Sequence, residues 1–211
     1  MNIYLVRHGE TIWNKDGRIQ GREDVPLNEK GIELAEITSK GMKEIPFDVI
    51  YSSPLIRARK TAEIMRGERI CPIHTDERLR EMSFGRYEGS LILEAAGDES
   101  HPLHDFIKNP GRYHARDGED FIQVIARARS FIHEVLLPLA GHAEHVMIAS
   151  HGALIRCFLR CIEERPLAEF WGGTAQRNCA VTHLQLEEGH FRIVEEGRLY
   201  YEIQPDGSFR L

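Results

Sequence analysis

Short apolar runs alternate along the chain with longer segments in which apolar residues recur every three or four positions. Three runs, rich in β-branched and other apolar residues, are typical of buried strands: 2–6, 47–51 and 145–149. Four segments have the periodicity of helices that cover a sheet: 29–43, 55–66, 120–139 and 153–162. Strands that alternate with helices predict a three-layer α/β/α sandwich around a mostly parallel central sheet.

Turn and cap residues predict the boundaries of these elements. Asn28 is an N-cap candidate, and Pro54, which follows two serines, is expected at the first position of the next helix. The remaining segments are predicted as two irregular stretches and a closing hairpin around Gly189: 13–26, 71–89, and 179–186 with 191–194.

The segment 85–118 is predicted to be an insertion. Short helical patterns within it are broken near Pro102 and Pro110. The 211 residues fit one domain, so we expect a single domain over 1–211 with this insertion as a cap over the site.

Composition narrows the classes of function. The net charge of −6 argues against a general binder of nucleic acid or of membrane surfaces, since either needs a basic face. No apolar run approaches the roughly 18 residues of a membrane span, and the first residues do not form a secretory signal. A cytoplasmic protein is therefore expected.

Unusual residues follow three of the predicted strands. Arg7-His8-Gly9 ends the first, Ser150-His151-Gly152 ends the third, and Arg57 lies in the helix after the second. The carboxyl ends of parallel strands meet at one sheet edge, where ligands of open α/β sheets bind. Two arginines, two imidazoles and a capped helix start predict an anion site. Glycine after each histidine lets the backbone turn sharply or approach a ligand.

Other histidines and cysteines do not predict a metal site. His142 with His145 and His101 with His104 are spaced by three, and neither pair has a third ligand at a familiar spacing. Among the four cysteines, Cys157 and Cys161 lie four apart on a predicted helix, but buried thiols are the expected role.

The segment 5–11 (LVRHGET), followed by Trp13-Asn14, resembles the signature of the histidine phosphatase superfamily, also called the phosphoglycerate mutase-like family. Further blocks follow in the family's order over nearly the whole chain: 26–31 (PLNEKG), 52–58 (SSPLIRA), 79–81 (LRE), 84–89 (FGRYEG), 150–152 (SHG) and 178–181 (NCAV). The block 84–89 is similar to the phosphatase branch that includes α-ribazole phosphatase and fructose-2,6-bisphosphatase-like enzymes.

The resemblance implies two-step phosphoryl transfer without metal or other cofactor, through a phosphohistidine on His8. Arg7, Arg57 and His151 would hold the phosphoryl oxygens, and Asn14 would add a neutral hydrogen bond. Minor contacts to the phosphate are implied for three more residues: Gln20, Gly21 and Gly152.

The resemblance also selects the acid. Glu77, Glu81 and Glu88 are all nearby carboxylates, and only the block 79–81 singles out Glu81 as the group that protonates the leaving alkoxide and later activates water. Glu10 is expected to buttress the loop after His8.

Hydrolysis is favoured over the main alternative, a cofactor-dependent phosphoglycerate mutase. Mutases of the family carry a tandem arginine pair after the catalytic glutamate, whereas residues 89–99 here are acidic and apolar. A non-catalytic member that binds a phosphorylated ligand or a partner protein, and a phosphatase acting on protein side chains, stay open.

We expect a small phosphorylated metabolite as substrate and leave open a homodimer. A basic cluster would contact the substrate or form a solvated face: Lys108, Arg112, His114 and Arg116.

Overall fold

The computed structural model describes residues 1–163, 165–203 and 209–210. Six strands form one sheet in the order β3-β2-β4-β1-β5-β6. β1, β2, β3 and β4 run parallel, and β5 and β6 run antiparallel to their neighbours. The bounds are β1 Asn2–Arg7, β2 Val49–Ser52, β3 Ile73–Thr75, β4 His145–Ser150, β5 Val181–Glu187 and β6 His190–Arg198. A separate pair consists of β7 (Glu202–Ile203) and β8 (Phe209–Arg210).

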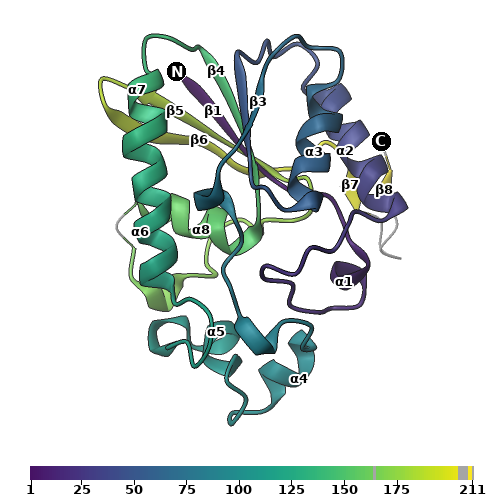
Figure 1. The fold of residues 1–211 in the computed structure, drawn as a ribbon, viewed down its shortest axis with the longest axis vertical. Helices are drawn as coiled ribbons and strands as arrows, with labels where there is room; N and C mark the ends of the chain where they lie inside the picture. Colours follow the sequence, from purple (N-terminus) through teal and green to yellow (C-terminus); the bar gives the residue numbers. More distant parts are fainter. Residues whose placement is uncertain (164, 204–208, 211) are drawn as a thin grey trace.

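Helices cover both faces of the sheet, which confirms the predicted α/β/α sandwich (Figure 1). On β1, Ile3 and Leu5 join the apolar cluster beneath α6 and α8, while Tyr4 and Val6 join the cluster on the α3 side. Both faces of the strand are therefore buried, as in a doubly covered parallel sheet. The helices are α2 Glu29–Gly41 and α3 Ile56–Arg66 on one side, and α6 Phe121–Phe131 and α8 Gly152–Arg160 on the other.

Three local predictions need correction. The edge strand β3 lies inside the segment predicted as irregular, because three residues after Pro72 give too short a pattern to detect. The segment predicted as a loop contains α1 (Ile12–Lys15), which Thr11 and Asn14 cap reciprocally. α3 begins at Ile56 and not at Pro54, because Asp24 from another segment accepts the Ile56 N–H at 2.7 Å.

The helix predicted over 120–139 is present with an irregular end. α6 continues through a π-helical turn, Ile132–Leu136, into α7 (Leu137–Leu139). Pro138 has no N–H to donate to the carbonyl four residues earlier, which accounts for a wider turn there.

The segment 85–118 lies beyond the carboxyl edge of the parallel strands, at the lower end of Figure 1. It contains α4 (Ile92–Gly97) and α5 (His104–Lys108), with short 3₁₀ turns at Gly85–Tyr87 and Pro110–Arg112. Similar turns lie outside it at Glu77–Leu79 and Leu167–Glu169. Phe106 of α5 attaches the segment to the domain through ring contacts with Phe84, Phe121 and Trp171.

All four cysteines are free thiols, and the Cys161 Sγ–H donates to the Cys157 carbonyl at 3.4 Å. Within the part of the chain that the structure describes, no three His, Cys, Asp or Glu side chains are grouped as metal ligands. None of the helices described is long and apolar enough to cross a membrane.

Candidate active site

A cavity of ≈ 340 Å³ is lined by residues at the ends of β1 and β4 and by residues of the segment 85–118. Because these strands are parallel neighbours, the residues that follow them lie together, as predicted. The lining of the cavity includes eight of the predicted site residues: Arg7, His8, Asn14, Gln20, Gly21, Arg57, Glu81 and Gly152.

His8 is buried at the base of this cavity, with one ring nitrogen already committed. Its Nδ1 lies 2.7 Å from the Gly9 carbonyl, which can only accept. Nδ1 therefore carries the hydrogen, and Nε2 keeps its lone pair. Asn178 Nδ2 donates to the His8 carbonyl at 3.1 Å, and the His8 N–H donates to Ser150, so the backbone is fixed as well.

The surroundings of His8 keep its imidazole neutral. Burial lowers its pKa well below 6.5, and the charges of Arg57 and Arg7 lower it further, against a smaller opposite effect of the Gly9 carbonyl. The pKa of His151 is likewise well below its usual value because of burial, with Arg57 and His8 adding to the effect. A neutral Nε2 is the form of histidine that can attack phosphorus.

These shifts predict that acidification destabilises the fold from pH 6.5 downward. Below pH 6.5, the ordinary pKa of histidine in an unfolded chain, the unfolded protein binds protons that the folded protein does not bind. The free energy of unfolding therefore decreases as the pH falls from 6.5 toward the lower pKa values of these histidines in the folded protein. Each histidine contributes a slope of up to about 1.4 kcal/mol per pH unit. Denaturant unfolding at a series of pH values between 7 and 5 gives the free energy of unfolding as a function of pH. This free energy should depend less steeply on pH in His8→Asn than in the wild type, and an unchanged pH dependence would contradict a neutral His8.

Two of the arginines that line the cavity each have one nitrogen without a hydrogen-bond partner among the described residues. Arg57 is fully buried, and its two Nη atoms donate to the Gly21 and Glu23 carbonyls at 2.7 Å. Burial lowers its pKa to about 10, against the attraction of Glu81, so it stays charged near neutral pH. Arg7 Nη1 donates to the Gln176 carbonyl at 2.6 Å. The Nε atoms of both arginines are buried without a hydrogen-bond partner among the described residues.

His151 lies beside His8 and behind the cavity wall. The ring centroids are 5.1 Å apart, and His151 does not itself line the cavity. Its Nε2 is 2.8 Å from Ser53 Oγ, whose hydroxyl can donate to it and leave the hydrogen on Nδ1. That Nδ1 is also buried and has no partner in the described chain. Unpaired buried donors are rare, and three of them belong to side chains that line the cavity or lie beside His8, which indicates a site for an anion.

The remaining predicted phosphate contacts have distinct environments. Asn14 Oδ1 accepts from Thr11 and from Asn178, which leaves its Nδ2 as the group to face a ligand. Gln20 is buried and its Oε1 has no partner within the described segments. Gly21 has φ +55°, and a Cβ there would lie 2.2 Å from Glu88 Oε1. Glycine is therefore required at 21 by the turn and by Glu88.

The two glycines after the histidines differ. A Cβ on Gly9 would lie 2.4 Å from the Gly31 carbonyl oxygen, so close packing against α2, and not against a ligand, requires this glycine. Gly152 lines the cavity, and a Cβ there would lie 3.6 Å from Arg7 Nε, an ordinary contact distance, so protein packing does not require glycine at this position. Glu10 accepts from Asn28 Nδ2 at 2.9 Å and so supports the loop after His8.

Of the three candidate carboxylates, only Glu81 lines the cavity. Its Oε1 accepts the N–H groups of Met82 and Leu154, and its Oε2 accepts that of Ala153, at 2.9–3.1 Å. The carboxylate therefore lies at the N-terminus of α8, beside Arg57 and Arg7. Glu77 is an exposed partner of Arg80.

Glu88 has a supporting role that sequence reasoning missed. Its carboxylate accepts the N–H groups of Phe84, Arg22 and Glu23 at 2.8–3.0 Å. It thereby fixes the loop whose carbonyls hold Arg57. Asn178 was missed in the same way, although its block belongs to the family pattern, because the pattern alone does not say what the side chain contacts.

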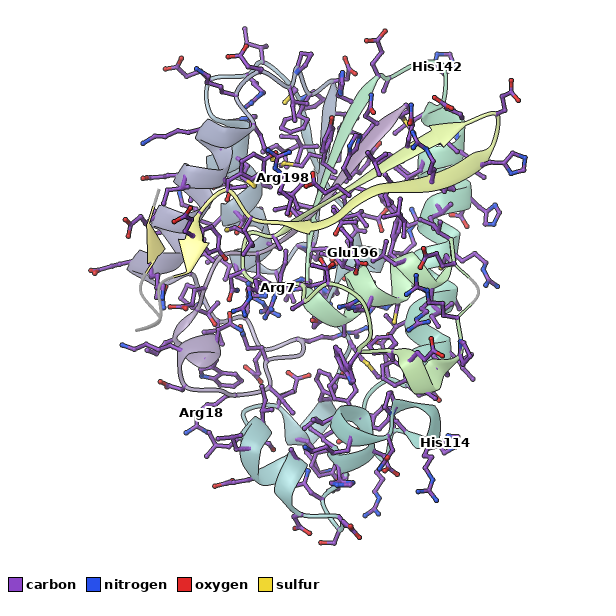
Figure 2. All side chains as sticks on the ribbon, turned by 180° about the vertical axis from the view of Figure 1, so that it is seen from behind. Arg7, Arg18, His114, His142, Glu196 and Arg198 are labelled. Carbon is purple, nitrogen blue, oxygen red and sulfur yellow. The ribbon has the colours of Figure 1, made fainter. Side chains whose placement is uncertain are left out.

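Beyond the predicted site residues, the cavity lining is mainly apolar. Its aromatic and aliphatic walls come from five residues: Ile19, Phe84, Ile92, Phe106 and Trp171. Arg18 also lines it from an exposed position, and Arg156 does so while paired with Glu196 at 2.9 Å. The basic cluster of 85–118 is exposed and does not line the cavity; Figure 2 shows His114 at the outer end of this segment, far from Arg7. Of the two roles expected for this cluster, the solvated face therefore fits the structure.

Comparisons with known proteins identify the family of the chain. The model of the histidine phosphatase superfamily, branch 1, matches residues 3–198. A Hydrogenobacter thermophilus protein named "Putative phosphoserine phosphatase 2" is 30% identical over 96% of this chain and 98% of its own length. The "Probable phosphoglycerate mutase GpmB" of Escherichia fergusonii is 31% identical over 90% of this chain and 87% of its own.

Two solved structures share the architecture. YhfR of Bacillus stearothermophilus superposes with a TM-score of 0.87 at 34% identity, covering 94% of this chain and 97% of that chain. A phosphoserine phosphatase from Entamoeba histolytica, solved with 3-phosphoglyceric acid, has a TM-score of 0.79 at 28% identity, covering 93% and 96%. The chain therefore belongs to the histidine phosphatase superfamily.

Proposed function

We propose that this protein is a metal-independent phosphatase that hydrolyses a small phosphomonoester through a phosphohistidine on His8. The observation that carries the proposal is the set of buried donors without described partners around a neutral imidazole: Arg7 Nε, Arg57 Nε and His151 Nδ1. A phosphoryl group supplies acceptor oxygens for such donors, and guanidinium groups suit it well.

In the first step His8 Nε2 attacks phosphorus, the N–P bond forms and the ester P–O bond breaks. Arg7, Arg57 and His151 stabilise the charge on the equatorial oxygens, and Asn14 Nδ2 adds one neutral donor. Protonated Glu81 gives its proton to the departing alkoxide.

In the second step water attacks the phosphohistidine and Glu81 takes a proton from it. The N–P bond breaks, inorganic phosphate forms, and His8 returns to the neutral state. The side chains themselves supply the positive charge and the proton donor that the two steps require.

Hydrolysis suits the cavity better than mutase chemistry does. A mutase must retain a sugar acid with a second phosphate and a carboxylate, which calls for more cations than a hydrolase needs. Outside the phosphoryl site the described lining offers Arg18 and Arg156, and Arg156 already donates to Glu196 and to the Gly172 and Thr174 carbonyls. The segment 85–118 contributes Ile92 and Phe106, which suit an apolar leaving group, and we take it as the cap of the site.

A substrate screen tests the assignment. With chelator present, the protein should release phosphate from p-nitrophenyl phosphate and from some members of a panel of phosphorylated metabolites. It should not interconvert 2- and 3-phosphoglycerate efficiently with bisphosphate cofactor. Efficient interconversion would establish the mutase instead, and binding of phosphate without any turnover would establish a non-catalytic member.

A further inference from the structure

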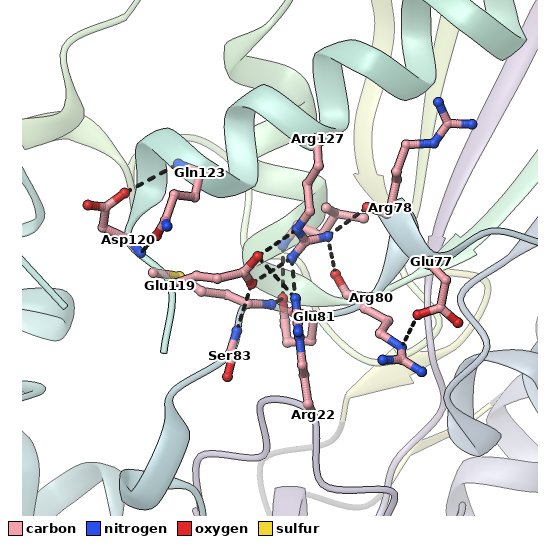
Figure 3. A network of polar contacts seen from close by, with 12 residues as sticks. Arg22, Glu77, Arg78, Arg80, Glu81, Ser83, Glu119, Asp120, Gln123 and Arg127 are labelled. Carbon is pink, nitrogen blue, oxygen red and sulfur yellow. Dashed lines mark hydrogen bonds and ion pairs between the residues drawn. The ribbon is translucent and has the colours of Figure 1, made fainter. Parts of the chain in front are cut away.

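Arg127, on α6 and outside the cavity lining, binds the segment that carries Glu81 through three hydrogen bonds of its guanidinium and binds Glu119 through two more. Nη1 donates to the Arg78 and Arg80 carbonyls at 2.6 Å, and Nη2 donates to the Glu81 carbonyl at 3.1 Å. The other two bonds, from Nε and Nη2, go to the two carboxylate oxygens of Glu119 at 3.1 Å. Five donors thus meet five acceptors (Figure 3).

Glu119 extends this fixation in two directions. Its Oε2 also accepts the Ser83 N–H at 3.0 Å, so the chain is held on both sides of Glu81. Its Oε1 lies 3.0 Å from Arg22 Nη2, in the loop whose carbonyls hold Arg57. Arg127 and Glu119 are mostly buried, at 14% and 16% side-chain exposure, so water screens these bonds weakly.

The segment around Glu81 depends on such contacts because it has little regular structure. Residues 80–84 follow a short 3₁₀ turn and belong to neither a helix nor a strand. Buried carbonyls need hydrogen-bond partners, and here side chains supply them: Arg127 for residues 78, 80 and 81, and Ser150 Oγ for Leu79 at 2.8 Å.

We propose that Arg127 and Glu119 are positioning residues for the acid–base step. They hold the backbone of Glu81 so that its carboxylate stays between the N-terminus of α8 and the phosphoryl site. The inference rests on the proposed role of Glu81 and adds that this role depends on a pair more than thirty residues away in sequence.

Lysine cannot replace Arg127 in this arrangement. An ammonium has three donors at one point, whereas the five acceptors lie around a planar fork. Arg127→Lys should therefore keep a cation in place but let the Glu81 backbone shift. Glu119→Gln keeps the shape and loses one acceptor, so it should have a smaller effect of the same kind.

The test compares kcat/KM for two aromatic esters of similar size. Benzyl phosphate must have its alkoxide protonated, and p-nitrophenyl phosphate releases a phenolate that leaves without a proton. Arg127→Lys should lower kcat/KM for benzyl phosphate about tenfold or more and that for p-nitrophenyl phosphate less than about threefold. The matched control is Glu134→Gln, which removes an exposed partner of Arg78 at 2.7 Å and should change neither value.

A double variant separates positioning from general damage. If Arg127 acts through Glu81, adding Arg127→Lys to Glu81→Gln should cause no further loss on benzyl phosphate. Additive losses, or equal losses of Arg127→Lys on both esters, would overturn the inference while leaving the acid assignment intact. If Glu81→Gln alone shows no preference between the esters, the acid role fails and the inference falls with it. Glu119→Gln answers the same question if Arg127→Lys does not fold.

Discussion

His8→Ala is expected to lower kcat/KM for p-nitrophenyl phosphate by about 10⁴-fold or more, the scale of loss when a covalent enzyme loses its nucleophile. The change removes the only ring nitrogen in the described cavity lining that has a free lone pair. Arg7 and Arg57, which we propose bind the phosphoryl group, remain, so inorganic phosphate should still bind. Steady-state kinetics and a phosphate titration measure both effects.

The matched control for this change is His142→Ala. His142 is exposed, close to the amino ends of the strands and far from Arg7 in Figure 2, so its removal should leave turnover unchanged. A His8→Ala protein that retains wild-type turnover would remove the basis of the proposed mechanism.

Glu81→Gln is expected to lower kcat/KM for benzyl phosphate by about 10²-fold or more, the usual contribution of a general acid. For p-nitrophenyl phosphate kcat/KM should change little, because nitrophenolate leaves unprotonated, while kcat should fall as the water step loses its base. Glutamine keeps the size of the side chain, and its one oxygen can still accept the N–H groups of Met82 and Leu154, while the acceptor for the Ala153 N–H is lost.

Glu77→Gln is the control for this variant, since Glu77 is exposed and pairs only with Arg80 in the described contacts. Equal losses on the two esters for Glu81→Gln would mean that Glu81 holds the site together without moving a proton.

The layers of the fold and the position of the site could be predicted because local patterns carry them. Apolar runs such as 145–149 predict buried strands. Parallel pairing of such strands brings His8 and Ser150 to one edge of the sheet, and this does not depend on the conformation of the loops. The charge pattern also predicts an anion site, since Arg7 and Arg57 gather there with two imidazoles. Family motifs then singled out Glu81 from its neighbours.

Contacts between distant segments could not be predicted in this way. The start of α3 depends on Asp24, and the loop beneath Arg57 depends on Glu88, yet neither residue has a local signal. Arg127 has the appearance of an ordinary polar residue on an amphipathic helix, and only the tertiary structure shows its five bonds. Likewise the packing of Gly9 against Gly31 explains a glycine for which the sequence predicts a sharp turn or close approach to a ligand.

The most direct measurement of the central claim is the identity of the phosphorylated residue in Glu81→Gln. With p-nitrophenyl phosphate this variant should form the phosphoenzyme readily and hydrolyse it slowly, so the intermediate should accumulate. Rapid quench and peptide mass spectrometry should find one phosphoryl group on His8, labile in acid and stable in base, and none in Glu81→Gln combined with His8→Ala. A phosphoryl group on another residue, or one that survives acid, would contradict a phosphohistidine at His8.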